Sequence, residues 1–92
     1  MDRDRLLALC RELQRAYWEA SERHCSDPVK CMFGGGASKV DEEVGPYVQR
    51  FAELLGEPIE DYTVDSEGCQ VVLPQKVVIV DVLNREVHVY RT

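Results

Sequence analysis

The spacing of the apolar residues changes at Pro58, and this change restricts the chain to one broad fold class. Before Pro58, apolar residues recur at intervals of three and four, which is the period of an amphipathic helix. After Pro58 they follow a period of two, which is the period of a strand with one buried face. A helical half followed by a half of strands predicts an α+β fold, in which helices cover one face of a sheet.

The helical half begins with an amphipathic segment over residues 3–24. Its apolar side chains, from Leu6 to Ala20, fall on one face of a helix. Pro28 disfavours a helical conformation at the residue before it. We therefore expect the first helix to end ahead of this proline and a Gly-rich loop to occupy residues 25–38.

A second helix is expected over residues 41–55, ended by Gly56. Ser38 would cap its amino terminus. Pro46 lies inside the segment, where a proline removes a backbone donor and clashes with the preceding turn. We therefore expect either a kink at Gly45-Pro46 or a main helix that begins at Pro46.

The remaining segment, residues 59–91, is rich in Val, Ile and Tyr and is divided by short turns. The expected strands span residues 59–65, 69–73, 76–82 and 86–91. Short connections join antiparallel neighbours, so the sequence predicts two amino-terminal helices packed on one face of a four-stranded antiparallel meander. With 92 residues, the chain is expected to form a single domain over residues 1–92.

The charge of the chain restricts its partners. The formal net charge of −6 argues against binding to DNA or RNA, because such binding depends on Lys and Arg side chains that neutralise phosphates. An acidic surface favours solubility and, where it binds a protein, a basic partner. The hydrophobic share of 45% is typical of a globular chain.

No segment of the sequence has the pattern of an export signal or a membrane span. The amino terminus is charged and amphipathic, and no run approaches the roughly 20 apolar residues that cross a bilayer. We therefore expect a cytoplasmic protein that binds no membrane. In that compartment the four cysteines are expected to be free thiols, with Cys10 as a small core residue and Cys69 packed in a strand.

The histidine and cysteine side chains raise the possibility of a metal site. Zinc prefers thiolate and imidazole ligands, but Cys10 and Cys25 would lie about 22 Å apart on one helix and could share neither a metal nor a disulfide. The candidate ligands that remain are His24, Cys25, Cys31 and Cys69. The interval between Cys25 and Cys31 is wider than that of the usual zinc knuckle, so the sequence does not specify a metal.

A thiol-dependent redox function needs only Cys25 and Cys31, because a short loop can bring the two sulfurs together. Lys30 adjoins Cys31, and Arg23 lies near Cys25. Positive neighbours favour the thiolate, which is the reactive form of cysteine. This pair is the centre of one alternative function.

The glycine-rich segment offers a candidate site for an anion or a nucleotide. Glycines let backbone amides converge on a phosphate, and a helix amino terminus adds free N–H groups. The candidate residues are Gly34, Gly35, Gly36, Ser38 and Lys39. The order of a Walker A motif is absent, and the carboxylates at 41–43 would repel a phosphate from the first turn of the expected helix. A plain linker is the competing interpretation.

No catalytic constellation stands out, so the sequence does not point to an enzyme, and no cofactor is expected. His88 alternates with the valines of its strand and is expected to face solvent. Asp81 stands in a run of valines, where an unpaired carboxylate would be costly. We expect it to pair with Arg85 or Arg91 across the hairpin.

These observations favour a small non-enzymatic interaction module that acts as a homodimer or by binding a larger protein. Leu7 and Trp18 share a line on the first helix about 100° from its main apolar stripe, which makes them candidate interface residues. Because Trp18 lies off this stripe, it is expected at the margin of the core, against a second subunit, a partner or the Gly-rich loop. Aromatic anchors of this kind dominate binding energies. The alternatives are the metal- or thiol-dependent protein centred on Cys25 and Cys31, and the anion-binding loop.

Overall fold

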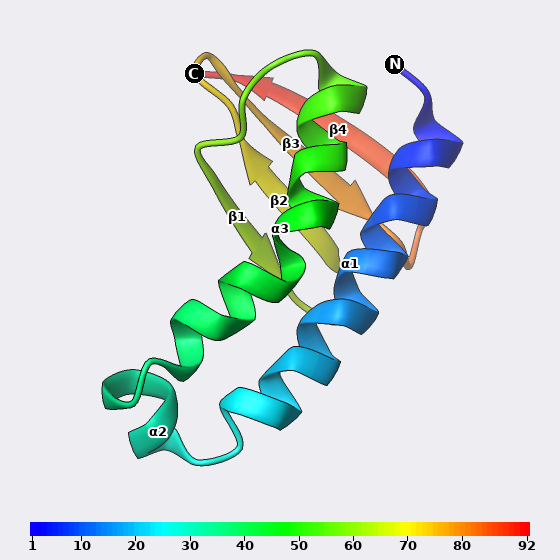
Figure 1. Ribbon diagram of the computed structural model, residues 1–92. Coiled ribbons are helices and arrows are strands. Elements are labelled where there is room, and N and C mark those ends of the chain that lie inside the picture. The colour runs from blue at the N-terminus through cyan, green and yellow to red at the C-terminus, as the bar shows by residue number, and fades with distance from the viewer.

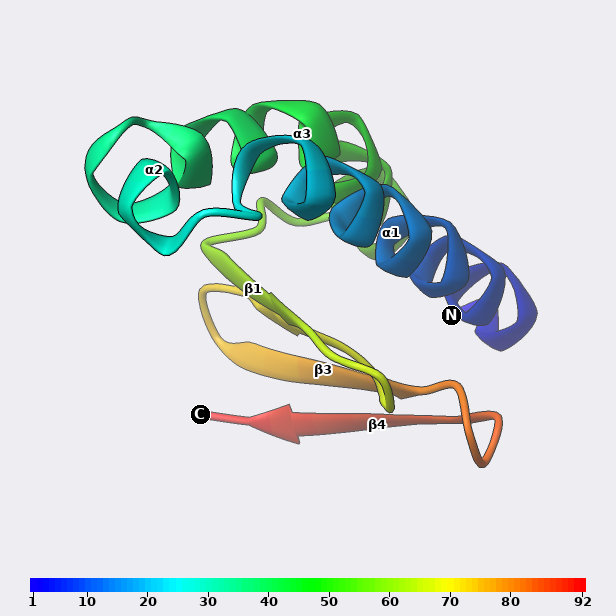
Figure 2. The same ribbon diagram turned by 90° about the horizontal axis from the view of Figure 1, so that it is seen from below.

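The computed structural model describes residues 1–92 and contains three helices and four strands. The elements are α1 (Arg3–His24), α2 (Pro28–Phe33), α3 (Gly36–Leu55), β1 (Asp61–Val64), β2 (Gly68–Val72), β3 (Lys76–Asp81) and β4 (Glu86–Arg91). Helices α1 and α3 lie side by side over one face of the sheet (Figures 1 and 2). This is the α+β arrangement that the sequence predicted.

The sheet is a meander in the order β1-β2-β3-β4, and all neighbours in it are antiparallel. The register places Tyr62, Val71 and Val78 in one row on the helical side of the sheet. The opposite face carries Gln70 and Ile79, and no helix lies over it (Figure 2). The alternation of buried and exposed residues along each strand follows from this one-sided cover.

One cluster of buried apolar side chains joins the two layers. Leu6 and Leu13 of α1, Phe51 of α3 and the sheet residues Val71 and Val78 are almost completely buried in it. These are the residues that the two apolar periods of the sequence place on the inner faces. Their burial supplies the main stabilising free energy, because each large apolar side chain contributes about 1.5–3 kcal/mol when it leaves water.

Helix α3 begins at Gly36, earlier than the start at residue 41 that the sequence predicted. Gly35 precedes it with a φ of 79°, a left-handed conformation that glycine adopts without strain. Ser38 therefore lies inside the helix and does not cap it. The helix continues through Pro46, and its axis changes direction midway (Figure 1), which is the expected effect of a proline on a helix.

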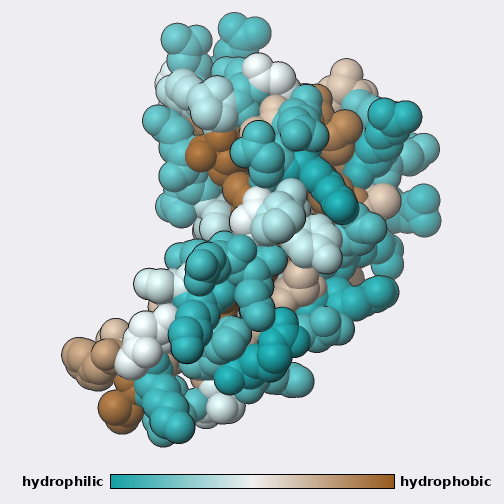
Figure 3. All heavy atoms as spheres, viewed as in Figure 1, coloured by the Kyte–Doolittle hydropathy of each residue, from teal (hydrophilic) through white to brown (hydrophobic).

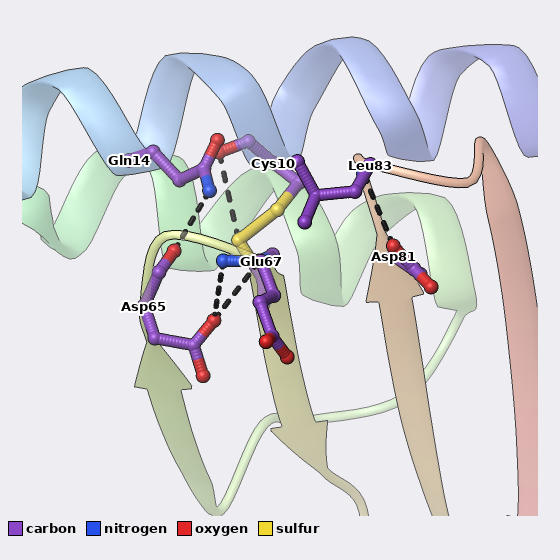
Figure 4. The surroundings of a disulfide bond; sticks show 8 residues. Cys10, Gln14, Asp65, Glu67, Asp81 and Leu83 are labelled. Carbon is purple, nitrogen blue, oxygen red and sulfur yellow. Dashed lines mark hydrogen bonds between the residues drawn. A yellow bond between two sulfur atoms is a disulfide. The ribbon is translucent and has the colours of Figure 1, made fainter.

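A disulfide between Cys10 and Cys69 joins α1 to β2, with the two Cα atoms 5.9 Å apart (Figure 4). Gln14, one turn further along α1, donates a hydrogen bond of 2.8 Å to the backbone carbonyl of Asp65. Both links hold the first helix against the β1–β2 hairpin. The structure contains no free cysteine, so the expectation of four free thiols is wrong, although Cys10 and Cys69 are buried as expected.

None of the three helices has the length and hydropathy of a membrane-spanning segment. The state of the cysteines bears on the compartment in which the chain folds. Two disulfides are typical of proteins in an oxidising environment. The cysteine chemistry therefore favours a non-reducing compartment over the cytoplasm that the sequence suggested.

Candidate docking site

The segment that connects the two long helices projects beyond the sheet at one end of the molecule (Figures 1 and 2). We call residues 24–39 the tip. It contains the end of α1, all of α2 and the first turn of α3. The sequence assigned residues 25–38 to a Gly-rich loop, whereas the structure places the short helix α2 there.

Local signals in the sequence account for α2. The Asp27 side chain accepts a hydrogen bond of 2.9 Å from the backbone N–H of Val29 and so caps the helix. Pro28 occupies the first turn, where its missing N–H costs nothing. Gly34 follows the helix, and its N–H bonds to the carbonyl of Lys30. Six residues are too few for a helix to persist alone, so α2 depends on further links.

The disulfide between Cys25 and Cys31 supplies one of these links. It joins the residue after α1 to the middle of α2, with the Cα atoms 4.3 Å apart. Gly36 supplies another, because it packs so closely that an added Cβ would lie 2.1 Å from the carbonyl oxygen of His24. The tip is therefore held at both ends, by a covalent bond on one side and by close backbone contact on the other.

Three large apolar side chains of α2 point away from the rest of the molecule. Val29 is 65% exposed, Met32 75% and Phe33 83%, and no residue of α2 is buried. Figure 3 shows the apolar surface that they form at the end of the molecule where α2 lies. Packing inside this chain therefore does not explain why α2 carries three large apolar side chains. Exposed apolar clusters of this kind mark interaction sites.

Basic side chains line a depression at the base of the tip. It has a volume of about 300 Å³, and no hydrophobic residue lines it. The lining residues are Arg23, His24, Lys30, Gly34, Gly36 and Lys39. Residues 23–40 include a single carboxylate, that of Asp27. The tip is thus locally basic on a chain whose formal net charge is −6.

Glu43 of α3 balances part of this positive charge. Its carboxylate accepts a hydrogen bond of 2.6 Å from Arg23 and lies 3.3 Å from Nε2 of His24. These two contacts, the one with Arg23 being the stronger, lower the pKa of the Glu43 carboxyl below its usual value. Lys30 and Lys39 form no ion pair, so the two lysines carry the uncompensated charge of the depression.

The predicted anion-site residues are only partly brought together. Gly34, Gly36 and Lys39 line the depression, whereas Gly35 and Ser38 do not. No acidic residue lies in the first turn of α3, because that helix starts earlier than expected. Glu43 nevertheless bonds to Arg23 and lies beside His24, two residues that line the depression, so one of the carboxylates at 41–43 still opposes anion binding there.

The predicted metal ligands are bonded to one another or separated. Cys25 and Cys31 form one disulfide, and Cys69 pairs with Cys10 in the other, inside the core. No group of three or more metal-ligating side chains exists in the structure. The sulfur atoms that a metal site would need are therefore bonded to one another. The sequence analysis expected that a short loop could bring Cys25 and Cys31 together, and the structure does so.

The two predicted interface residues have different environments. Leu7 is 6% exposed and belongs to the core of this chain, so it has little surface to offer a partner. Trp18 is 54% exposed and borders a depression lined by side chains of α1 alone. Of the two predicted interface residues, only Trp18 is therefore available to contact a partner.

The remaining titratable candidates lie at the turns and edge of the sheet. His88 is exposed, as predicted, and lies 3.1 Å from the carboxylate of Glu86. Asp81 does not pair with an arginine. It accepts hydrogen bonds from the backbone N–H groups of Leu83 and Asn84 and from the Asn84 side chain, which lower its pKa. Asp81 thus stabilises the turn that follows β3.

Comparisons with protein-family models, with curated proteins and with solved structures find no match for this chain.

Proposed function

We propose that this protein is a non-enzymatic interaction module that docks onto a protein partner through the tip. The observation that carries the proposal is the exposure of Val29, Met32 and Phe33 on a helix held in place by the Cys25–Cys31 disulfide. Truncating an apolar anchor at the centre of an interface commonly costs 2 kcal/mol or more, about 30-fold in affinity. An anchor on a rigid element binds more tightly, because less conformational entropy is lost on docking.

The charges around the tip indicate the chemistry of the partner. Lys30 and Lys39 form no ion pair in the structure. Lys30 lies between Val29 and Met32 in the sequence, and Lys39 follows Phe33 by six residues. The matching surface is an apolar groove with an acidic rim, because complementary charges speed association and orient the partner. The negative net charge of the whole chain would favour a basic partner. The tip itself is basic, however, and more distant charges are screened by salt, so the charge of the tip determines which partner surface it attracts.

A second copy of the chain is a poorer occupant for the tip than a different protein. A two-fold symmetric contact brings the same surface of each copy together. The Lys30 and Lys39 side chains of both copies would then lie in one interface, and like charges at an interface oppose association. Association of two copies would have to use another surface, for which exposed Trp18 is the candidate.

Site-specific photo-crosslinking tests the proposal. A photoreactive phenylalanine derivative replaces Phe33 in one version of the protein and Leu83 in a matched control version. Leu83 is also a highly exposed apolar residue, but it lies in the turn between β3 and β4. Crosslinked proteins from the native source are identified by mass spectrometry, purified and titrated with the unmodified chain.

The expected result is a protein that crosslinks from position 33 and not from position 83. Its affinity should fall about tenfold or more for the Met32→Ser/Phe33→Ser variant and stay unchanged for Leu83→Ser. Lys30→Glu should weaken binding most at low salt, because screening reduces the contribution of the charge. Equal crosslinking from both positions, full affinity of the double variant, or insertion of the tip into anionic vesicles in place of a protein would overturn the proposal.

A small anion is the second candidate ligand of the tip, favoured by the basic depression at its base. Inorganic phosphate should then raise the melting temperature above that in chloride at equal ionic strength, and Lys39→Gln should abolish the difference. An unchanged melting temperature in phosphate contradicts anion binding.

A further inference from the structure

The two disulfides of the chain lie in different environments. Cys10 is 0% exposed and Cys69 4%, and both belong to the core cluster. Cys25 and Cys31 are only partly buried and lie at the projecting tip. Exchange with an external thiol requires that the thiolate reach a sulfur atom, so access decides which bond reacts in the folded protein.

We propose that Cys25–Cys31 is a site of thiol–disulfide exchange with an external dithiol, and that reduction there releases α2. The exchange at Cys25–Cys31 is inferred from the difference in exposure between the two disulfides. The release of α2 rests on the proposed function, because α2 carries the apolar side chains of the tip. The reactant is a dithiol as a chemical class, such as a dithiol oxidoreductase or a small reagent.

The exchange proceeds in two balanced steps. A thiolate of the dithiol attacks one sulfur of Cys25–Cys31, forms a mixed disulfide and displaces the other cysteine as a thiolate. The second thiol of the reactant then attacks the mixed disulfide and releases the remaining cysteine. The dithiol is oxidised to a disulfide, and Cys25 and Cys31 together gain two electrons and two protons.

Basic side chains around the tip assist the first step. His24 directly precedes Cys25, and Lys30 directly precedes Cys31. Both also line the basic depression together with Arg23 and Lys39. A thiolate leaves more readily where positive charge stabilises it, so the lysine next to Cys31 in the sequence favours Cys31 as the displaced thiolate.

Loss of this bond would leave α2 with few restraints. The helix has six residues and buries none of them. Its remaining support includes the Asp27 cap and the packing of Gly36 against the backbone of Lys30 and Cys31. A helix of this length is not stable on its own, so we expect the α2 amides to lose their protection after reduction.

Alkylation with peptide mapping tests the exchange itself. The oxidised protein is treated under native conditions with increasing amounts of dithiothreitol, alkylated and digested, and the modified cysteines are counted at each step. Cys25 and Cys31 are expected to be modified about tenfold or more faster than Cys10 and Cys69, whose reduction requires the core to open. Modification of all four cysteines at one rate, or of Cys10 and Cys69 first, would overturn the exchange site.

Hydrogen exchange of the α2 amides tests the release of the helix, and it needs no partner protein. Protection of residues 29–33 should fall in the selectively reduced protein and in the Cys25→Ser/Cys31→Ser variant, while that of β2 and β3 should stay unchanged. Unchanged protection of α2 in either sample would overturn the release. Because neither measurement uses the docking partner, failure of the proposed function would leave both results interpretable.

Discussion

Arg23, at the end of α1, donates a hydrogen bond of 2.6 Å to the carboxylate of Glu43 in α3. The two residues are 20 positions apart in the chain, and the tip lies between them. The contact therefore joins α1 to α3 at the base of the tip, in addition to the Cys25–Cys31 disulfide. It also lowers the pKa of Glu43, so the contact depends on pH.

Glu43→Gln should lower the melting temperature at neutral pH and have little effect in acid. A carboxyl whose pKa is lowered by folding contributes stability above its ordinary pKa, near 4.3, and loses it as the pH falls through the lowered value. The difference in melting temperature between wild type and variant should therefore shrink over that range. Glu42→Gln is the control, because Glu42 is exposed and forms no ion pair, and it should show no such trend. A pH-independent difference for Glu43→Gln would contradict the pairing.

Removal of the two disulfides should have unequal effects on stability. The loop-entropy relation gives about 4 kcal/mol for the 59-residue separation of Cys10 and Cys69 and about 2 kcal/mol for the six-residue separation of Cys25 and Cys31. Urea denaturation of the Cys10→Ala/Cys69→Ala and Cys25→Ala/Cys31→Ala variants measures both losses. A larger loss for the tip variant would show that the tip is part of the cooperative core.

Gln14→Leu should lower the free energy of unfolding by about 1–3 kcal/mol. The substitution removes the donor to the Asp65 carbonyl and leaves a partly buried acceptor without a partner. Gln70→Leu, on the exposed outer face of the sheet, is the matched control and should change stability by less than about 0.5 kcal/mol. Equal losses of stability for the two substitutions in urea titrations would show that the Gln14 hydrogen bond does not stabilise the fold.

Trp18→Ala should weaken association more than it lowers the melting temperature. The side chain is 54% exposed, so its removal leaves no cavity, whereas Leu13→Ala in the same helix should cost about 2–5 kcal/mol. Sedimentation measurements with increasing protein concentration, together with titration of any identified partner, measure association. Unfolding of Trp18→Ala with association intact would show that Trp18 belongs to the core.

Gly36→Ala should destabilise the junction of α2 and α3 more than Gly35→Ala does. A Cβ at position 36 would lie 2.1 Å from the His24 carbonyl oxygen and 2.9 Å from the Cys31 Cα, which forces the backbone apart at a cost of about 1–3 kcal/mol. At position 35 an added Cβ meets no atom within 4 Å, and only the strain of a positive φ remains, about 1 kcal/mol. The melting temperature should therefore fall further for Gly36→Ala than for Gly35→Ala.

The apolar periods were sufficient to predict the layers of the fold. The residues with a period of three and four in α1, such as Leu13, and the alternating valines, such as Val78, are buried as their spacing requires. The start of α3 was missed because glycine disfavours helix interiors on propensity alone. Gly36 is helical because its missing side chain permits contact with His24, and this tertiary contact cannot be read from local sequence.

The tip was identified as unusual, but its structure was only partly predicted. The predicted end of the first helix ahead of Pro28 is confirmed, whereas the start of α2 at the same Asp27-Pro28 pair was not predicted, although this pair is the signature of a helix start. The pairing of Cys10 with Cys69 depends on how α1 lies across β2, which no spacing rule specifies. Asp81 likewise bonds to the turn that follows it and pairs with neither Arg85 nor Arg91, because the Leu83 and Asn84 donors are closer to its carboxylate.

The order of the elements along the chain, with the helices before the strands, has a consequence for synthesis from the amino terminus. Both long helices are complete before the first strand exists, so Cys10 must wait for Cys69 while Cys25 and Cys31 are already available. The rigid axis of α1 separates Cys10 from Cys25 by about 22 Å, beyond the reach of a disulfide. Once α1 has formed, Cys25 can therefore pair with Cys31 but not with Cys10, whose partner Cys69 is synthesised only with β2.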